Sequence, residues 1–121
     1  MGYLAARIRS FRHAIRGCFV LVCTQPHARI HLVASLVVVV AGVAARLGAH
    51  DWASVVLAMA CVWVAEAVNT AIEFAVDLSS PERNPIARNA KDVAAAAVLL
   101  ASMAAVVVAG FIFGPWLTGQ R

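Results

Sequence analysis

Charged residues are scarce in this chain, whereas apolar residues are abundant. Of its 121 residues, 13% are charged and 63% are hydrophobic, and the mean hydropathy is +0.85. A soluble domain of this length has too small an interior to bury so much apolar surface. The composition therefore excludes an ordinary soluble domain and predicts a single domain that lies in a membrane.

Glycine-rich phosphate-binding motifs are absent. The seven glycines are scattered and form neither GxxxxGK(S/T) nor GxGxxG, the two loops whose backbone amides cradle phosphates. This absence excludes a P-loop and a protein-kinase-type glycine-rich loop. The three cysteines, Cys18, Cys23 and Cys61, have no metal-ligand spacing, so we expect buried thiols rather than a disulfide framework.

Acidic residues are also few, and the net charge is +4. The basic residues flank apolar segments, and Tyr3 is the only tyrosine. This distribution favours contact with membrane lipids, so no nucleic-acid partner is expected. His27 and His31 stand four residues apart and could share a metal ion, but without an HExxH pattern a polar patch at the membrane interface is favoured.

Residues 1–23 form a basic segment with helical periodicity. Its apolar residues share one face and three arginines gather on a neighbouring face; the residues are Leu4, Ile8, Phe11, Ile15, Phe19 and Val22, and Arg9, Arg12 and Arg16. The pattern predicts an amphipathic helix lying in the membrane interface. A signal peptide is the alternative, but Gln25, His27, Arg29 and His31 interrupt the apolar run that should follow.

Three membrane helices are predicted, over residues 27–49, 52–77 and 85–117. Thr24 is the expected cap of the first of them, with Pro26 in its first turn. Asn84 can cap the last helix, with Pro85 at its first position. The predicted fold class is an all-α integral membrane protein: an N-terminal interfacial helix plus three transmembrane helices.

Basic residues are distributed unevenly between the two sides of these spans. Residues 1–31 hold five and the 78–92 connection holds three, whereas the 46–51 reversal and the C-terminal tail hold one each. The positive-inside rule places the N-terminus and the 78–92 connection in the cytoplasm. With three spans, the C-terminus lies across the membrane.

Five of the six acidic residues fall between Glu66 and Asp92. On a helix, Glu66, Asn69, Glu73 and Asp77 lie at about 0°, 300°, 340° and 20°, which makes a polar stripe about 80° wide. Carboxylates in a membrane segment are costly unless they are paired, hydrated or coordinating, so the stripe is a candidate functional site. The alternatives are a polar seam between helices and a small proton-coupled transporter.

The side chains of this region suit phosphoryl transfer. Glu73 and Asp77 offer hard oxygen ligands to Mg²⁺, which fills its other positions with phosphate and water. Lys91 offers a positive charge to phosphate, and Asp92 could orient it or touch a nucleotide. Glu66, deeper along the helix, could take a proton from an alcohol held at bilayer depth. Metal, phosphate anchor and base are the parts of a phosphoryl-transfer site.

One motif covers the stripe and the start of the next helix. It reads Glu66-x-x-Asn69-Thr70-Ala71-Ile72-Glu73-x-x-Val76-Asp77, followed after thirteen residues by Lys91-Asp92-Val93-Ala94. This motif closely resembles the small bacterial integral-membrane diacylglycerol kinases and their relatives, the undecaprenol kinases. The resemblance covers nearly the whole chain and includes Phe11, Gly17, Arg29-Ile30-His31 and Gly110-Phe111-Ile112-Phe113.

The resemblance implies an enzyme that phosphorylates a lipid alcohol, with ATP as co-substrate and Mg²⁺ as cofactor. It implies a homotrimer in the bacterial cytoplasmic (inner) membrane, with active sites between subunits on the cytoplasmic side. Diacylglycerol is the acceptor expected, which would yield phosphatidic acid. Undecaprenol is the alternative acceptor, and Arg29-Ile30-His31 leans toward it.

The resemblance also assigns roles by position. Glu66 matches the general base, Glu73 a Mg²⁺ ligand, and Asn69 and Asp77 supporting polar residues. The residues matching nucleotide contacts are Gln25, Glu73, Glu82, Arg83, Asn84, Lys91 and Asp92. Two of these depart from the family pattern. Gln25 stands where a second metal-ligating Glu is frequent, and its amide oxygen can coordinate Mg²⁺ without bringing a charge. Asn84 stands where His is frequent.

Overall fold

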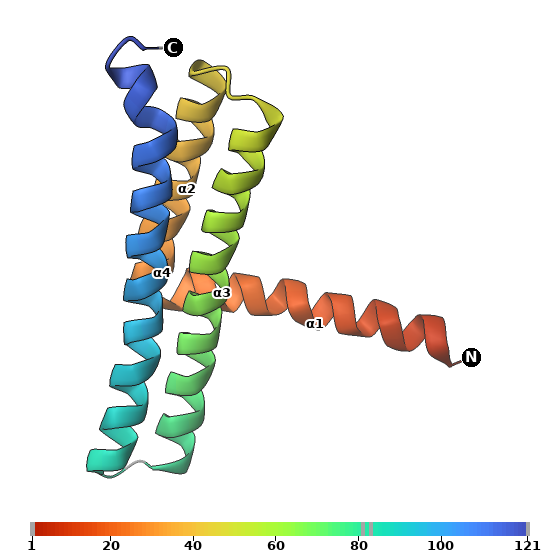
Figure 1. Cartoon of the computed structure of the whole chain (residues 1–121). Helices are drawn as coiled ribbons and strands as arrows, with labels where there is room; N and C mark the ends of the chain where they lie inside the picture. The colour runs from red at the N-terminus through yellow and green to blue at the C-terminus, as the bar shows by residue number, and fades with distance from the viewer. Residues whose placement is uncertain (1, 81, 83, 121) are drawn as a thin grey trace.

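The computed structural model describes residues 2–80, 82 and 84–120. These residues form helices α1 (Tyr3–Thr24), α2 (Pro26–Ala44), α3 (Ala49–Ser79) and α4 (Pro85–Leu117). Helices α2, α3 and α4 run alongside one another, whereas α1 projects crosswise from the start of α2 (Figure 1). The all-helical prediction is confirmed.

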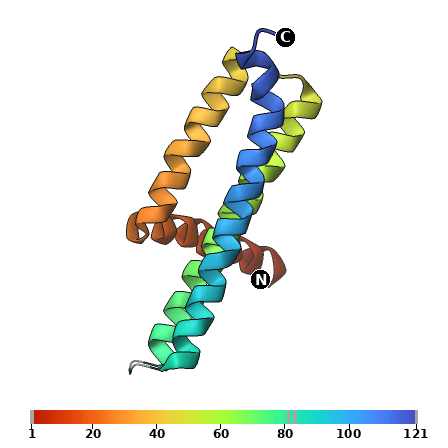
Figure 2. The same cartoon turned by 60° about the vertical axis from the view of Figure 1, so that its left-hand side comes forward.

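Within the described part of the chain, α2, α3 and α4 are long and apolar enough to cross a membrane, with 19, 31 and 33 residues. At 1.5 Å per residue they measure about 28, 46 and 50 Å, against about 30 Å of hydrocarbon. The α3–α4 hairpin accordingly extends past the level at which α1 joins α2 (Figures 1 and 2). The C-terminal end of α3 is therefore carried beyond the region where all three long helices run together.

Helix boundaries follow local side-chain chemistry. Asn84 caps α4 as predicted, because its Oδ1 accepts hydrogen bonds from the amides of Ile86 at 2.8 Å and Ala87 at 3.4 Å. The prediction for Thr24 was wrong: Thr24 ends α1, its hydroxyl donates to the carbonyl of Val20 at 2.8 Å, and Gln25 precedes α2. A residue before proline avoids the helical conformation, so the break falls at Gln25, ahead of Pro26.

Arg29 fixes the corner between α1 and α2. Its Nε donates to the carbonyl of Val22 at 3.1 Å and its Nη2 to that of Cys23 at 2.6 Å. These carbonyls lie in the last turn of α1, where acceptors have no partner within the helix. A cation is also favoured at this end of a helix dipole. The direction in which α1 leaves the corner is therefore set by a residue of α2.

Helix α2 ends at Ala44, before the predicted boundary at residue 49, in a tight turn. The amide of Leu47 donates to the carbonyl of Gly42 and that of Arg46 to Val43, both at 3.1 Å. Arg46 takes the left-handed conformation that ends such helices, with φ 51. Gly42 lies against Trp52: a Cβ built there would stand 2.7 Å from Cη2 of the indole.

Replacing Gly42 by alanine should therefore destabilise the fold. Overpacking at a filled position costs about 1–3 kcal/mol, and the melting temperature in detergent, followed by circular dichroism, should fall. Gly110→Ala is the matched control, because nothing lies within 4 Å of a Cβ there and alanine is the better helix former by roughly 0.5–1 kcal/mol. Equal shifts for both variants would contradict the close contact.

The three cysteines are free and exposed on the single chain, so the prediction of buried thiols was wrong. Large apolar side chains are likewise exposed along every helix, among them Phe11, Phe19, Leu57 and Phe111. One crosswise helix and three long ones make a thin assembly with little interior. Apolar positions on such helices face lipid or another subunit rather than a core of their own chain.

Candidate functional site

Glu66 is buried between α2 and α3, with only 3% of its surface exposed. Its Oε2 lies 3.9 Å from Nε2 of His31 on α2. The ring of His31 stands edge-on to that of Trp63, whose Nε1 donates to the hydroxyl of Ser35 at 3.0 Å. A carboxylate shielded in this way is suited to accept a proton from a bound substrate rather than from bulk water.

Asn69 and Glu73 are joined along the same helix. Nδ2 of Asn69 donates to Oε1 of Glu73 at 2.9 Å, which orients the carboxylate. Asn69 is 8% exposed, and its Oδ1 has no hydrogen-bond partner. Amide and carboxylate oxygens are the ligands that Mg²⁺ and its bound waters prefer. These two side chains therefore suit a hard cation.

The remaining polar residues gather at the α3–α4 hairpin. Asp77 on α3 pairs with Lys91 on α4, with 2.9 Å between Oδ1 and Nζ. Arg88 and Asp92 lie 3.8 Å apart on the surface of α4, a pair too exposed to contribute much stability. A cavity of about 370 Å³ opens among them, lined by Val76, Asp77, Ser80, Glu82, Asn84, Ala87, Arg88, Lys91 and Asp92.

This polar cavity brings together four residues predicted as nucleotide contacts: Glu82, Asn84, Lys91 and Asp92. Arg83 lies outside the described residues. Two cations and several carboxylates around one opening provide partners for phosphates and for a bound metal. Arg88 was not among the predicted residues. The sequence could have indicated this ion pair, because Arg88 stands four residues before Asp92 and so shares its helix face.

The two residues predicted to bind the metal lie on different parts of the chain. Gln25 lies at the break between α1 and α2, and Glu73 is on α3, where its carboxylate accepts the hydrogen bond from Asn69. Across the described ranges, no three His, Cys, Asp or Glu side chains form a metal cluster. A Mg²⁺ ion held mainly by phosphate oxygens needs few protein ligands, so Glu73 with Asn69 still fits the ion.

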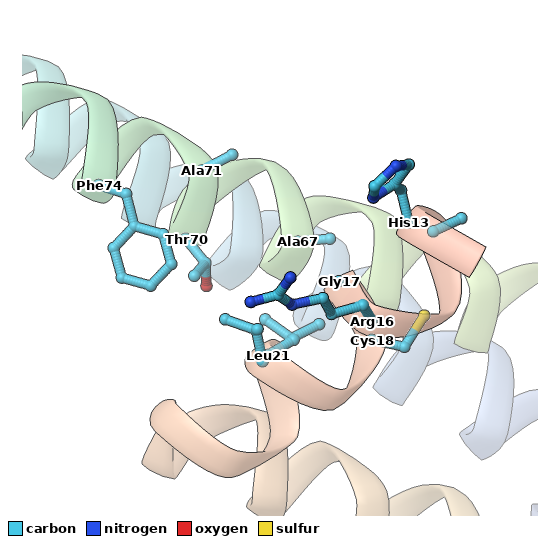
Figure 3. Close-up of a pocket in the computed structure, with 11 residues that line it drawn as sticks. His13, Arg16, Gly17, Cys18, Leu21, Ala67, Thr70, Ala71 and Phe74 are labelled. Atoms are coloured by element: carbon cyan, nitrogen blue, oxygen red, sulfur yellow. The ribbon is translucent and has the colours of Figure 1, made fainter. Parts of the chain in front are cut away.

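A second, apolar cavity of about 500 Å³ lies between α1 and α3. Figure 3 shows Thr70 and Phe74 projecting from α3 toward the residues that α1 contributes. The lining residues are His13, Ala14, Arg16, Gly17, Cys18, Val20, Leu21, Ala67, Thr70, Ala71 and Phe74. The sequence did not reveal this cavity, and Thr70 entered the motif without a role, although it follows Glu66 by one helical turn.

Comparison with known proteins places this arrangement in a family. The sequence model of the prokaryotic diacylglycerol kinases matches residues 12–113. An undecaprenol kinase of Bacillus subtilis (strain 168) is 33% identical over 109 residues, which are 90% of this chain and 89% of that protein. A diacylglycerol kinase of Synechocystis sp. is 39% identical over 107 residues, which are 88% of this chain but 61% of that protein.

The family match spans α1 from residue 12, all of α2 and α3, α4 up to residue 113, and every residue that lines the two cavities. A lipid kinase family replaces the transporter as the reading of this chain. Together with the three apolar helices, these matches make this a multi-pass membrane protein. The chain belongs to the prokaryotic diacylglycerol kinase family and is a lipid kinase.

Proposed function

We propose that this kinase transfers the γ-phosphoryl group of ATP to diacylglycerol, with Mg²⁺ as cofactor, and forms phosphatidic acid. The order of features along α3 carries the proposal. Ala67, Thr70, Ala71 and Phe74 border the apolar cavity, and the polar cavity begins with Val76 and Asp77. One helix thus joins a compartment suited to a lipid to a compartment suited to a nucleotide, with the buried Glu66 at its lipid end.

Glu66 is the proposed general base of the transfer. Glu66 accepts the proton of the acceptor hydroxyl, whose oxygen attacks the γ-phosphorus of ATP. The bond from the γ-phosphorus to the β,γ-bridging oxygen breaks, and ADP leaves with that oxygen. Glu66 suits this role because it is 3% exposed, so water does not compete with the acceptor hydroxyl for the carboxylate.

Glu73 is proposed to hold the metal, with Gln25 completing the site when nucleotide is bound. When bound, the ion would stabilise the negative charge of the phosphates and the negative charge that develops during transfer. Lys91, Asp92, Glu82, Arg83 and Asn84 are proposed to contact the nucleotide. Asp77 supports this set by pairing with Lys91 at 2.9 Å, and Asn69 supports it by orienting Glu73.

Gln25→Glu should lower the Mg²⁺ concentration that gives half-maximal rate. A second carboxylate strengthens a site for a hard cation, whereas an amide contributes no charge. Several-fold tightening is expected in a titration of the initial rate against Mg²⁺ at fixed ATP. Gln120→Glu, at the other end of the molecule, is the control for added negative charge. An unchanged titration would remove position 25 from the metal site.

The membrane arrangement is proposed to place α1 at the cytoplasmic interface of the bacterial inner membrane. The basic residues of α1 and of the hairpin favour this side. The hairpin extends past the level of α1 in both views of the fold (Figures 1 and 2), so its polar cavity would open to cytoplasmic nucleotide.

Cysteine labelling in intact cells tests this orientation, after Cys18, Cys23 and Cys61 are replaced by serine. A cysteine at Ser80 should be protected from a membrane-impermeant thiol reagent because it faces the cytoplasm, and a cysteine at Gly119 should react. Permeabilised cells, in which both should react, provide the control. The opposite pattern would place the polar cavity outside the cell.

Undecaprenol is the second candidate acceptor. The Bacillus relative named for it is matched over 89% of its length, and the apolar cavity between α1 and α3 would also suit a prenyl chain. Transfer of labelled phosphate from ATP to each lipid, in detergent micelles with Mg²⁺, tests the proposal. Higher kcat/KM for diacylglycerol is expected; preference for undecaprenol would change the acceptor, and transfer to neither lipid would refute both.

A further inference from the structure

Thr70 carries a buried hydroxyl that the protein leaves unused. Thr70 is 5% exposed, and its Oγ1 has no hydrogen-bond partner. Among the described residues, Asn69 Oδ1 is the other buried side-chain oxygen or nitrogen without a partner. Other helical hydroxyls donate to the carbonyl four residues earlier, as Thr24 does at 2.8 Å and Thr118 at 3.1 Å. A buried hydroxyl without a partner is costly, which suggests that a ligand supplies the partner.

The surroundings of Thr70 indicate the chemical class of that ligand. Thr70 of α3 lines the apolar cavity of about 500 Å³ to which α1 also contributes residues (Figure 3). It follows Glu66 by four residues, so the two side chains share one face of α3, about 6 Å apart along its axis. The other lining residues are mostly apolar. The cavity therefore suits a neutral amphiphile whose polar group reaches Thr70, one helical turn from Glu66.

We infer that the Thr70 hydroxyl donates a hydrogen bond to the reacting oxygen of the lipid acceptor and thereby fixes it beside Glu66. This inference rests on the proposed kinase function and names an acceptor-binding residue for it. An alcohol oxygen has one proton and two lone pairs. Its proton is directed to Glu66, one lone pair attacks the γ-phosphorus, and the other accepts from Thr70.

The bonding balances during transfer. The acceptor O–H bond breaks and its proton goes to Glu66, the new O–P bond forms, and ADP leaves. Thr70 keeps its own proton throughout, so it acts by binding and orientation. Arg16 lines the same cavity and offers a counter-charge to the phosphate monoester that results.

Thr70→Val tests the inference, because valine keeps the shape of threonine and removes only the hydroxyl. We expect kcat/KM for the lipid acceptor to fall about tenfold, the worth of one lost hydrogen bond, with KM for ATP unchanged. Thr70→Ser should stay within about twofold of the wild type, since it retains the donor. Thr118→Val, at the far end of α4, controls for the chemical change.

Thermal stability provides a readout that separates binding from structure. Because the hydroxyl has no protein partner, Thr70→Val should melt at or above the temperature of the wild type in the absence of lipid. A lower melting temperature, or a weaker oligomer in detergent, would show that the hydroxyl bonds to protein, and the inference would fail. It would also fail if Thr70→Val kept the wild-type kcat/KM, or if Thr70→Ser lost as much as Thr70→Val.

The same assay distinguishes this failure from failure of the proposed function. If the wild type phosphorylates a lipid but Thr70→Val does so equally well, only the role of Thr70 is lost. If the wild type phosphorylates neither diacylglycerol nor undecaprenol, the kinase chemistry proposed for these acceptors falls and the inference falls with it.

Discussion

Replacing Glu66 by glutamine should lower kcat about 10²- to 10⁴-fold while ATP still binds. The amide has the size of the carboxylate but cannot accept the proton of the acceptor hydroxyl. Glu66 is 3% exposed, so bulk water has little access to take the place of the missing base. The measurements are initial rates at saturating lipid and ATP, and nucleotide affinity by equilibrium binding.

Glu73→Gln is the matched control for this experiment, since it makes the same chemical change two turns further along α3. It should raise the Mg²⁺ concentration required for half-maximal rate, because it removes charge from the metal site. If Glu66→Gln retained more than about a tenth of wild-type activity, the assignment of Glu66 as the base would be wrong.

Mixing two inactive variants should restore activity if each site is built from two chains. Within one chain, Glu66 contacts α2 through His31, whereas Asp77 contacts α4 through Lys91. Asp77 lies about 16 Å further along the axis of α3 than Glu66. We therefore expect Glu66 of one subunit to work with Lys91 of the next in a homotrimer.

The test combines Glu66→Gln with Lys91→Met in equal amounts and lets subunits exchange in detergent. In a closed ring with random mixing, about a quarter of composite sites receive both intact residues, so about a quarter of wild-type activity should return. No activity should return if each site lies within one chain.

A second mixture, of the wild type with a variant that carries both Glu66→Gln and Lys91→Met, distinguishes the two arrangements by the amount of activity that remains. Composite sites would again retain about a quarter of the activity, whereas sites within one chain would retain about half. Subunit exchange is verified separately with differently tagged chains. Recovery of half the activity, with none from the two single variants, would refute the composite site and leave the kinase chemistry standing.

The sequence by itself determined the parts of this protein that depend on neighbours along the chain. Runs of apolar residues indicated the three long helices, and Asn84 followed by Pro85 indicated the start of α4. Helical periodicity put Glu66, Asn69, Glu73 and Asp77 on one face of α3. The bond between Asn69 and Glu73 at 2.9 Å is a direct consequence of that periodicity.

The limits of local reasoning appear at the helix ends. Thr24 is a good cap in isolation, but the restraint that Pro26 imposes on Gln25 moved the break by one residue. The cysteines looked like core residues because an apolar setting usually means burial. In a thin membrane assembly, however, an apolar position can equally face lipid, and one-dimensional patterns do not distinguish these two surroundings.

Only the tertiary structure decided what lies opposite each functional side chain. Periodicity tells which residues share a face of one helix but not which face of another helix meets them, because that depends on the crossing of the helices. The corner held by Arg29 sends α1 across α3 and creates the apolar cavity at Thr70. The pairing of α3 with α4 brings Lys91 to Asp77, and the approach of α2 sets His31 against Glu66. These contacts join residues far apart in sequence, so they follow from packing between helices rather than from any local pattern.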